Sequence, residues 1–166
     1  DPGDLASGEV KRQSLTPAQL ELWLATQIND DSSRAFNENL VLKLTGDLNV
    51  QALETSLQQL VARHEALRST FADDGSYQEI KPHVDLDMPF TDLTSVPQDD
   101  RESQLADAIL SVVDMPFDIF EGPLLRVHLF QVSDQEYRFL LSAHHLICDG
   151  WSSGVLLEDL GTLYTA

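Results

Sequence analysis

A strand-like segment that ends in two adjacent histidines constrains the fold of this chain most strongly. Residues 137–143 are largely apolar, His144 and His145 follow directly, and Asp149-Gly150 marks a tight turn before a helix-like segment. A strand that turns sharply into a helix can hold an imidazole at the mouth of a cleft, where the free N–H groups of the new helix also point. This order of elements favours an α/β fold and indicates a reactive centre at the turn.

The chain begins with a helix signal. Thr16-Pro17-Ala18-Gln19 supplies an N-cap hydroxyl, a proline in the first turn and a glutamine positioned for a reciprocal cap. Apolar residues recur at helical spacing after this start, and we expect them on its buried face: Leu20, Trp23, Leu24 and Ile28.

Helical and extended patterns alternate through the rest of the chain. Helical spacing is found in 53–64, 105–113 and 156–164, with His64 on the buried side of its segment, and strand patterns are found in 39–44, 67–71, 77–80, 124–132 and 137–143. Polar turns at 73–76 and 133–136 predict two hairpins, and three prolines make 81–97 a loop with short extended pieces. Interleaved helices and at least one antiparallel hairpin predict a mixed sheet with packed helices in the α/β class.

The charge of the chain excludes some partners. Ten Lys and Arg residues against 28 Asp and Glu residues give a formal net charge of −18, which repels phosphate backbones and anionic lipid headgroups. We therefore expect neither nucleic acid nor a membrane as partner. The single cysteine, Cys148, cannot form an internal disulfide, which favours a reducing cytoplasm. Residues 1–13 are polar and read as a flexible linker or tail, which leaves 14–166 as one folded unit.

The residues at the turn allow several roles. Alternation along a strand sends His144 and His145 to opposite sides, so only one of them can face a cleft; the alternative is a buried pair hydrogen-bonded to backbone. Asp149 could in the abstract be a base or a metal ligand, but its position favours a helix cap or a partner for an arginine. Cys148 is expected to be a small buried hydrophobe rather than a nucleophile. We expect no metal site, because adjacent histidines cannot both reach one ion from a strand.

Four stretches together resemble the motifs of the condensation domains of nonribosomal peptide synthetases, which belong to the chloramphenicol-acetyltransferase-like group. The histidine segment matches H-H-x-x-x-D-G and continues with Trp151-Ser152. Ser14 to Trp23 is similar to S-x-A-Q-x-R-x-W, Arg63 to Phe71 to R-H-E-x-L-R-T-x-F, and Pro116 to Arg126 to P-F-D-L-x-x-G-P-L-L-R. The motifs of the family's second lobe have no counterpart. The resemblance therefore implies a single chloramphenicol-acetyltransferase-like lobe, the N-terminal one, over 14–166.

The resemblance also implies a reaction and its partners. The amine of one carrier-bound aminoacyl group attacks the thioester of an acyl group on another carrier, and an amide bond forms. Both substrates are held on phosphopantetheine arms of donor and acceptor carrier proteins, and no cofactor binds the domain directly. The missing C-terminal lobe would complete the channel, and the exposed lobe interface makes self-association an expectation for the chain alone.

Site roles follow from the same resemblance. The catalytic set is His144, His145, Asp149 and Gly150, in which His145 is the reactive imidazole and His144 packs structurally. Asp149 is architectural, and the N–H of Gly150 faces the oxyanion or only permits the turn. Support for the site is expected from Arg63 as first partner of Asp149, Arg68 as second, Trp151 and Ser152.

Relatives within the group are separated by the same segment. Heterocyclisation domains replace both histidines with aspartates and are excluded, and epimerisation domains usually continue as D-x-V-S-W, unlike this chain. Residues 31–38 are similar to condensation domains that follow polyketide modules, which would imply a polyketide-derived or β-amino acyl donor. Two alternatives stay open: a non-catalytic lobe that docks carrier proteins, and a free-standing coenzyme A-dependent acyltransferase whose self-association completes the cleft.

Overall fold

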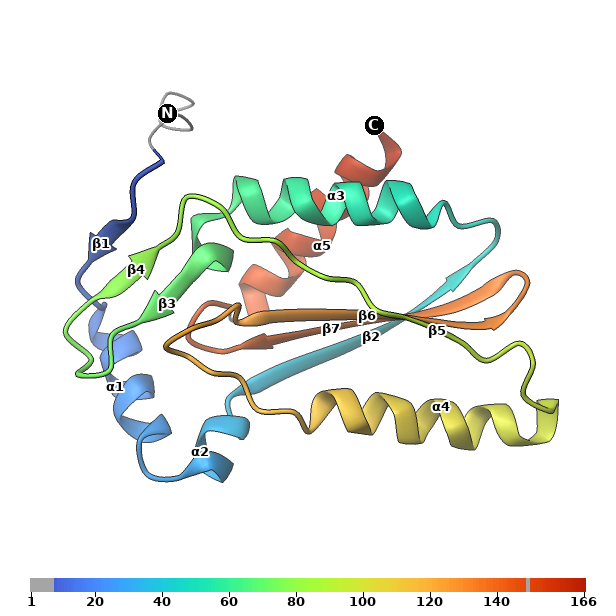
Figure 1. The fold of residues 1–166 in the computed structure, drawn as a ribbon, viewed down its shortest axis with the longest axis horizontal. Coiled ribbons are helices and arrows are strands. Elements are labelled where there is room, and N and C mark those ends of the chain that lie inside the picture. The colour runs from blue at the N-terminus through green and yellow to red at the C-terminus, as the bar shows by residue number, and fades with distance from the viewer. Residues whose placement is uncertain (1–7, 149) are drawn as a thin grey trace.

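A four-stranded mixed sheet organises the chain (Figure 1). The structure is a computed structural model that describes residues 8–148 and 150–166, with residues 30 and 150–152 described by their backbone alone. The strand order is β2-β7-β6-β5, in which β5 runs parallel to β6 and the other neighbours are antiparallel. The strands are β2 (Asn37–Thr45), β5 (Phe90–Asp92), β6 (Leu125–Ser133) and β7 (Glu136–His144).

A second sheet of three short strands lies at one end of the first. It consists of β1 (Lys11–Gln13), β4 (Gln78–Ile80) and β3 (Ser69–Phe71), with β4 in the centre and antiparallel to both neighbours. Residues 11–13, which we expected to belong to the flexible tail, are therefore a paired strand. The expected strand at 67–71 begins as a 3-10 turn, Glu65–Arg68, because the chain leaves helix α3 there before it extends.

Helices cover both faces of the larger sheet (Figure 1). Helices α3 (Val50–Arg63) and α5 (Gly150–Thr165) lie on one face, and α4 (Gln98–Val113) lies on the other. Helices α1 (Pro17–Thr26) and α2 (Asp30–Arg34) lead into β2, and α2 was not expected from the sequence. None of the helices in the described part of the chain is both long and apolar enough to cross a bilayer. The mixed sheet with packed helices that the sequence predicts is confirmed.

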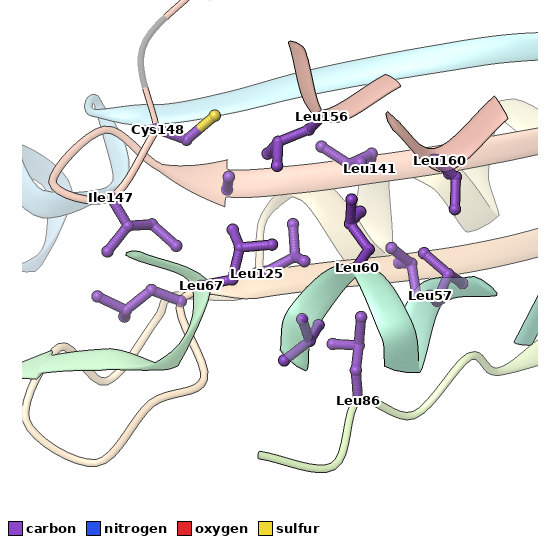
Figure 2. Close-up of a cluster of buried hydrophobic side chains, with 14 of the residues drawn as sticks. Leu57, Leu60, Leu67, Leu86, Leu125, Leu141, Ile147, Cys148, Leu156 and Leu160 are labelled. Atoms are coloured by element: carbon purple, nitrogen blue, oxygen red, sulfur yellow. The ribbon is translucent and has the colours of Figure 1, made fainter. Parts of the chain in front are cut away.

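The main core lies between the sheet and the pair α3 and α5 (Figure 2). Leu57 and Leu60 from α3 meet Leu141 of β7 and Leu160 of α5 there, and all four are almost fully buried. Both helices are thereby fixed against the strand that carries the histidines. A smaller core on the opposite face packs residues of α4 against β6 and β7.

Helix α1 departs from the expected burial pattern. Its N-cap is as predicted, because Thr16 and Gln19 cap each other reciprocally with N···O distances of 2.9 and 3.1 Å. Only Trp23 and Thr26 of the helix are buried, and the left-handed Gly75 lets the hairpin turn approach the Trp23 ring closely. The side chains expected beside Trp23 in the core are instead exposed: Leu20 at 42%, Leu24 at 56% and Ile28 at 73%. The prediction of a buried stripe on α1 is wrong, because a single tryptophan fills the contact.

Leu60→Ala is expected to destabilise the chain much more than Leu24→Ala. Leu60 is fully buried, and truncating such a leucine costs about 2–5 kcal/mol because a cavity remains. Leu24 is more than half exposed, so the same truncation is expected to change the free energy of unfolding by less than about 0.5 kcal/mol. Urea unfolding of both variants measures this, and equal losses would contradict the burial assigned to α1.

Candidate functional site

The pairing of β2 with β7 positions the two histidines. Asn37 lies opposite His144, and the ladder continues one residue beyond the strand because the backbone N–H of His145 donates to the Phe36 carbonyl at 2.7 Å. Side chains alternate along β7, so His145 shares the α3 and α5 side with Leu141, and His144 shares the α4 side with Leu140. The predicted placement of the two rings on opposite sides is confirmed.

His144 is a packed and neutral side chain. It is fully buried, its Nδ1 accepts the backbone N–H of Leu146 at 3.1 Å, and its Nε2 lies 3.3 Å from the Ser33 hydroxyl. Burial lowers its pKa to about 4, and the neighbouring charge of His145 acts in the same direction. Since Nδ1 accepts, the neutral ring carries its proton on Nε2.

His145 stands in a different environment. Its side chain is 36% exposed, and its Nδ1 lies 2.9 Å from Oε1 of Glu38, which is 32% exposed. An ionised carboxylate only accepts hydrogen bonds, so this contact places the ring proton on Nδ1 and leaves the lone pair of Nε2 available. No hydrogen-bond partner of Nε2 is found among the described residues. The arrangement can take up a proton at Nε2 from a molecule bound beside it.

Sequence reasoning missed Glu38 as a site residue. The signal was available, because Glu38 stands in the same register of β2 as Leu40, Leu42 and Leu44, the side of the strand that faces the core. An acidic residue in the inward register of a strand requires a partner. That partner lies 107 positions further along the chain, and only the β2–β7 register identifies it.

The loop after the histidines is held by the first motif and by helix α5. Gln19 of the first motif donates to the Leu146 carbonyl at 3.4 Å. Cys148 is buried, as expected, and its sulfur lies 3.1 Å from the Ser153 hydroxyl of α5. Ser153 in turn donates to Oε2 of Glu38 at 3.3 Å. Three elements, β2, the loop and α5, therefore meet beside His145.

The third motif packs on the other side, against His144. The ring of Phe117 meets that of His144 edge to face at 6.4 Å, and the Arg126 guanidinium lies over the Phe117 ring at 4.3 Å. Arg126 also donates to the carbonyls of Val112 and Met115, at 3.2 and 3.0 Å, which fixes the end of α4. This motif therefore shapes the wall behind the histidine pair.

The second motif holds helix α5. Arg63 is half exposed, and its Nη1 lies 3.9 Å from Oδ2 of Asp159, while Nε2 of His64, a partly buried ring, lies 2.7 Å from the same oxygen. Arg68 donates instead to the backbone carbonyls of Val61 and Lys81, at 3.1 and 2.5 Å. Asp149, the expected partner of Arg63 or Arg68, lies outside the described residues, so that pairing stays a prediction.

The remaining expected site residues are placed only by their backbone. Helix α5 begins at Gly150 and includes Trp151 and Ser152, whose side chains are outside the described set. The roles expected for these three residues stay predictions. Within the described residues, no group of three or more His, Cys, Asp or Glu side chains could hold a metal ion.

Residues 10–166 match the condensation domain family. The chain belongs to this family. A linear gramicidin synthase from Brevibacillus parabrevis is 40% identical over 162 residues, which are 95% of the chain and 3% of that protein. Chondramide synthase cmdD of Chondromyces crocatus is 38% identical over 154 residues, 92% of the chain and 4% of that protein.

Solved structures agree with this assignment. The starter condensation domain of the rhizomide synthetase RzmA superposes with a TM-score of 0.84 at 26% identity, over 94% of the chain and 38% of that structure. A structure of the complex of the X-domain and OxyB from teicoplanin biosynthesis matches with a TM-score of 0.81 at 28% identity, over 96% of the chain and 34% of the matched structure. The chain thus spans well under half of the condensation domains it resembles, and its fold is that of one condensation-domain lobe.

The buried, neutral His144 predicts a specific loss of stability in acid. In the unfolded chain a histidine binds a proton near pH 6.5, whereas the folded His144 resists protonation down to about pH 4. The unfolded state therefore binds more protons between these values, and the free energy of unfolding falls as the pH is lowered from about 6.5 to about 4. We expect this single residue to contribute on the order of 3 kcal/mol to that fall.

The matched comparison is His144→Asn, which keeps an acceptor for the Leu146 N–H but does not titrate. Urea unfolding of both proteins at intervals from pH 7 to pH 4 is expected to give a distinctly shallower acid dependence for the variant. Parallel curves would show that His144 is protonated as readily in the folded chain as in the unfolded one.

Proposed function

We propose that this chain is the N-terminal lobe of a condensation domain that joins a carrier-bound acyl group to a carrier-bound aminoacyl group. The amine attacks the thioester carbonyl, a C–N bond forms, and the C–S bond to the donor breaks. The donor leaves as a phosphopantetheine thiol, and the product remains on the acceptor arm as an amide. Membership in the condensation domain family supports this assignment.

The single observation that carries the proposal is the His145 ring at the end of β7. It is partly exposed, its Nδ1 is held by a carboxylate, and its Nε2 is free to accept a proton. An α-amino group has a pKa of roughly 7.7–8.0, so a large part of the nucleophile is already neutral near physiological pH. His145 therefore need not be a strong base. It takes up the proton that the amine loses as the C–N bond forms.

The other motif residues have supporting roles in this proposal. His144 packs behind the site, and the N–H of Gly150 faces the oxyanion of the tetrahedral intermediate. Asp149 fixes the turn by capping α5 or by pairing with Arg63 or Arg68. Trp151 and Ser152, in the first turn of α5, complete the wall.

A second lobe completes the channel in this proposal. The solved condensation domains are more than twice as long as the chain, and Leu20, Leu24 and Ile28 expose apolar surface beside the site-bearing end. Two carrier arms must be held within near-attack distance of each other, which requires two walls. The partners are therefore the donor and acceptor carrier proteins and the C-terminal lobe. Without that lobe, self-association is the expected behaviour. A reducing compartment such as the cytoplasm fits the single, buried cysteine.

Two alternatives make different predictions. A docking lobe without catalysis needs no oriented imidazole, so the carboxylate at Nδ1 of His145 favours the catalytic assignment. A free-standing coenzyme A-dependent acyltransferase would act without carrier proteins. The donor type is proposed to be polyketide-derived or β-amino acyl, on the similarity of residues 31–38 to condensation domains that follow polyketide modules.

His145→Ala, made in the chain joined to its C-terminal lobe, is expected to lower the rate of amide formation by about 10²–10⁴, the usual contribution of a general base. The assay supplies loaded donor and acceptor carriers and detects the amide by mass spectrometry. His83→Ala is the matched control, because that histidine is 73% exposed and pairs only with Asp85 among the described residues. A near wild-type rate for His145→Ala would remove the catalytic role.

The 166-residue chain, assayed alone with the same carriers, is expected to form no amide. If the two-lobe domain also binds carriers without forming product, the docking alternative is correct. If the chain alone transfers an acyl group from coenzyme A, the free-standing acyltransferase is correct.

A further inference from the structure

We propose that Glu38 is a positioning residue that holds His145 with its proton on Nδ1 and its Nε2 aimed at the reacting amine. This inference rests on the proposed function of His145 and adds a residue to it. The contact that carries it joins Oε1 of Glu38 to Nδ1 of His145 at 2.9 Å.

The backbone fixes this contact. Glu38 lies directly opposite Ala143 in the β2–β7 register, and His145 is two residues beyond Ala143 on the same side of the strand. The two residues are thus diagonal neighbours, within reach of each other for long side chains. The backbone hydrogen bond from His145 to Phe36, at 2.7 Å, continues the register to this point. The positions of both side chains are therefore set by the same ladder.

The carboxylate is itself held at both oxygens. Oε1 faces His145, and Oε2 accepts the Ser153 hydroxyl at 3.3 Å. Ser153 belongs to α5, so the carboxylate joins strand β2, the residue after β7 and the helix that follows the turn. A carboxylate fixed in this way orients the imidazole plane as well as its proton.

The two adjacent histidines consequently carry opposite tautomers. Nδ1 of His144 accepts the Leu146 N–H, so its proton is on Nε2, whereas the Glu38 carboxylate requires the proton of His145 on Nδ1. A purely stabilising pair explains this poorly, since Glu38 and His145 are both about one-third exposed and ion pairs at such exposure contribute little to stability. The selective consequence of the contact is a free Nε2 lone pair on the exposed ring.

The tautomers can be measured in the 166-residue chain. Proton–nitrogen correlation spectra at a pH where both rings are neutral are expected to show an Nδ1–H ring for His145 and an Nε2–H ring for His144. Glu38→Leu is expected to lose the Nδ1–H preference of His145 and leave His144 unchanged. The matched control is Glu136→Leu, because Glu136 is a carboxylate of similar exposure, 28%, at the far end of the same ladder.

Activity supplies the second readout. In the two-lobe domain, Glu38→Leu is expected to lower kcat on the order of 10- to 100-fold with little change in KM, less than the loss of the whole base. Glu38→Gln retains an oxygen that can accept from Nδ1 and is expected to restore part of this loss. It also serves as the test variant if Glu38→Leu fails to fold.

The inference is overturned if Glu38→Leu, or Glu38→Gln in its place, keeps both the His145 tautomer and the wild-type kcat while His145→Ala is inactive. The proposed function then still stands. A fully active His145→Ala domain overturns the proposed function instead, and the spectra decide independently whether Glu38 sets the tautomer of the ring.

Discussion

The register of β2 against β7 is the constraint on which the rest of the structure depends. Nine cross-strand pairs, from Asn37 opposite His144 to Thr45 opposite Glu136, join the two strands in the larger sheet. A slip of one residue would turn every side chain of one strand to the other face. The inward leucines of β2 and the nearly completely buried side chains of β7 forbid such a slip. The hydrophobic core therefore also decides where Glu38 lies relative to His145.

The sequence predicts the elements well because their signals are local. The reciprocal cap at Thr16, the hairpin of β6 and β7, and the separation of His144 from His145 each depend on residues close together in the chain. Two predictions failed because contacts distant in sequence decide them. Whether residues 11–13 pair depends on β4, and whether Leu24 is buried depends on what packs against α1. Glu38 was missed for the same reason.

The four motifs have a common structural purpose around the histidines. Gln19 of the first supports the histidine loop, Phe117 of the third packs against His144, and His64 of the second binds α5 through Asp159. Most of these residues position other groups and make no contact with His145. Membership in the condensation domain family, shown over residues 10–166, therefore corresponds in this lobe to a frame built around one partly exposed imidazole.

The most direct test of this account compares the reactivity of the two adjacent histidines in the folded chain. Diethyl pyrocarbonate modifies accessible neutral imidazoles, and fragmentation mass spectrometry can separate neighbouring sites. With exposed His83 as the internal reference, the structure predicts steady modification of His145 and protection of the fully buried His144 until urea unfolds the chain. Modification of His144 at the rate of His145, or faster, in the folded chain would contradict the register and with it the assignment of the site.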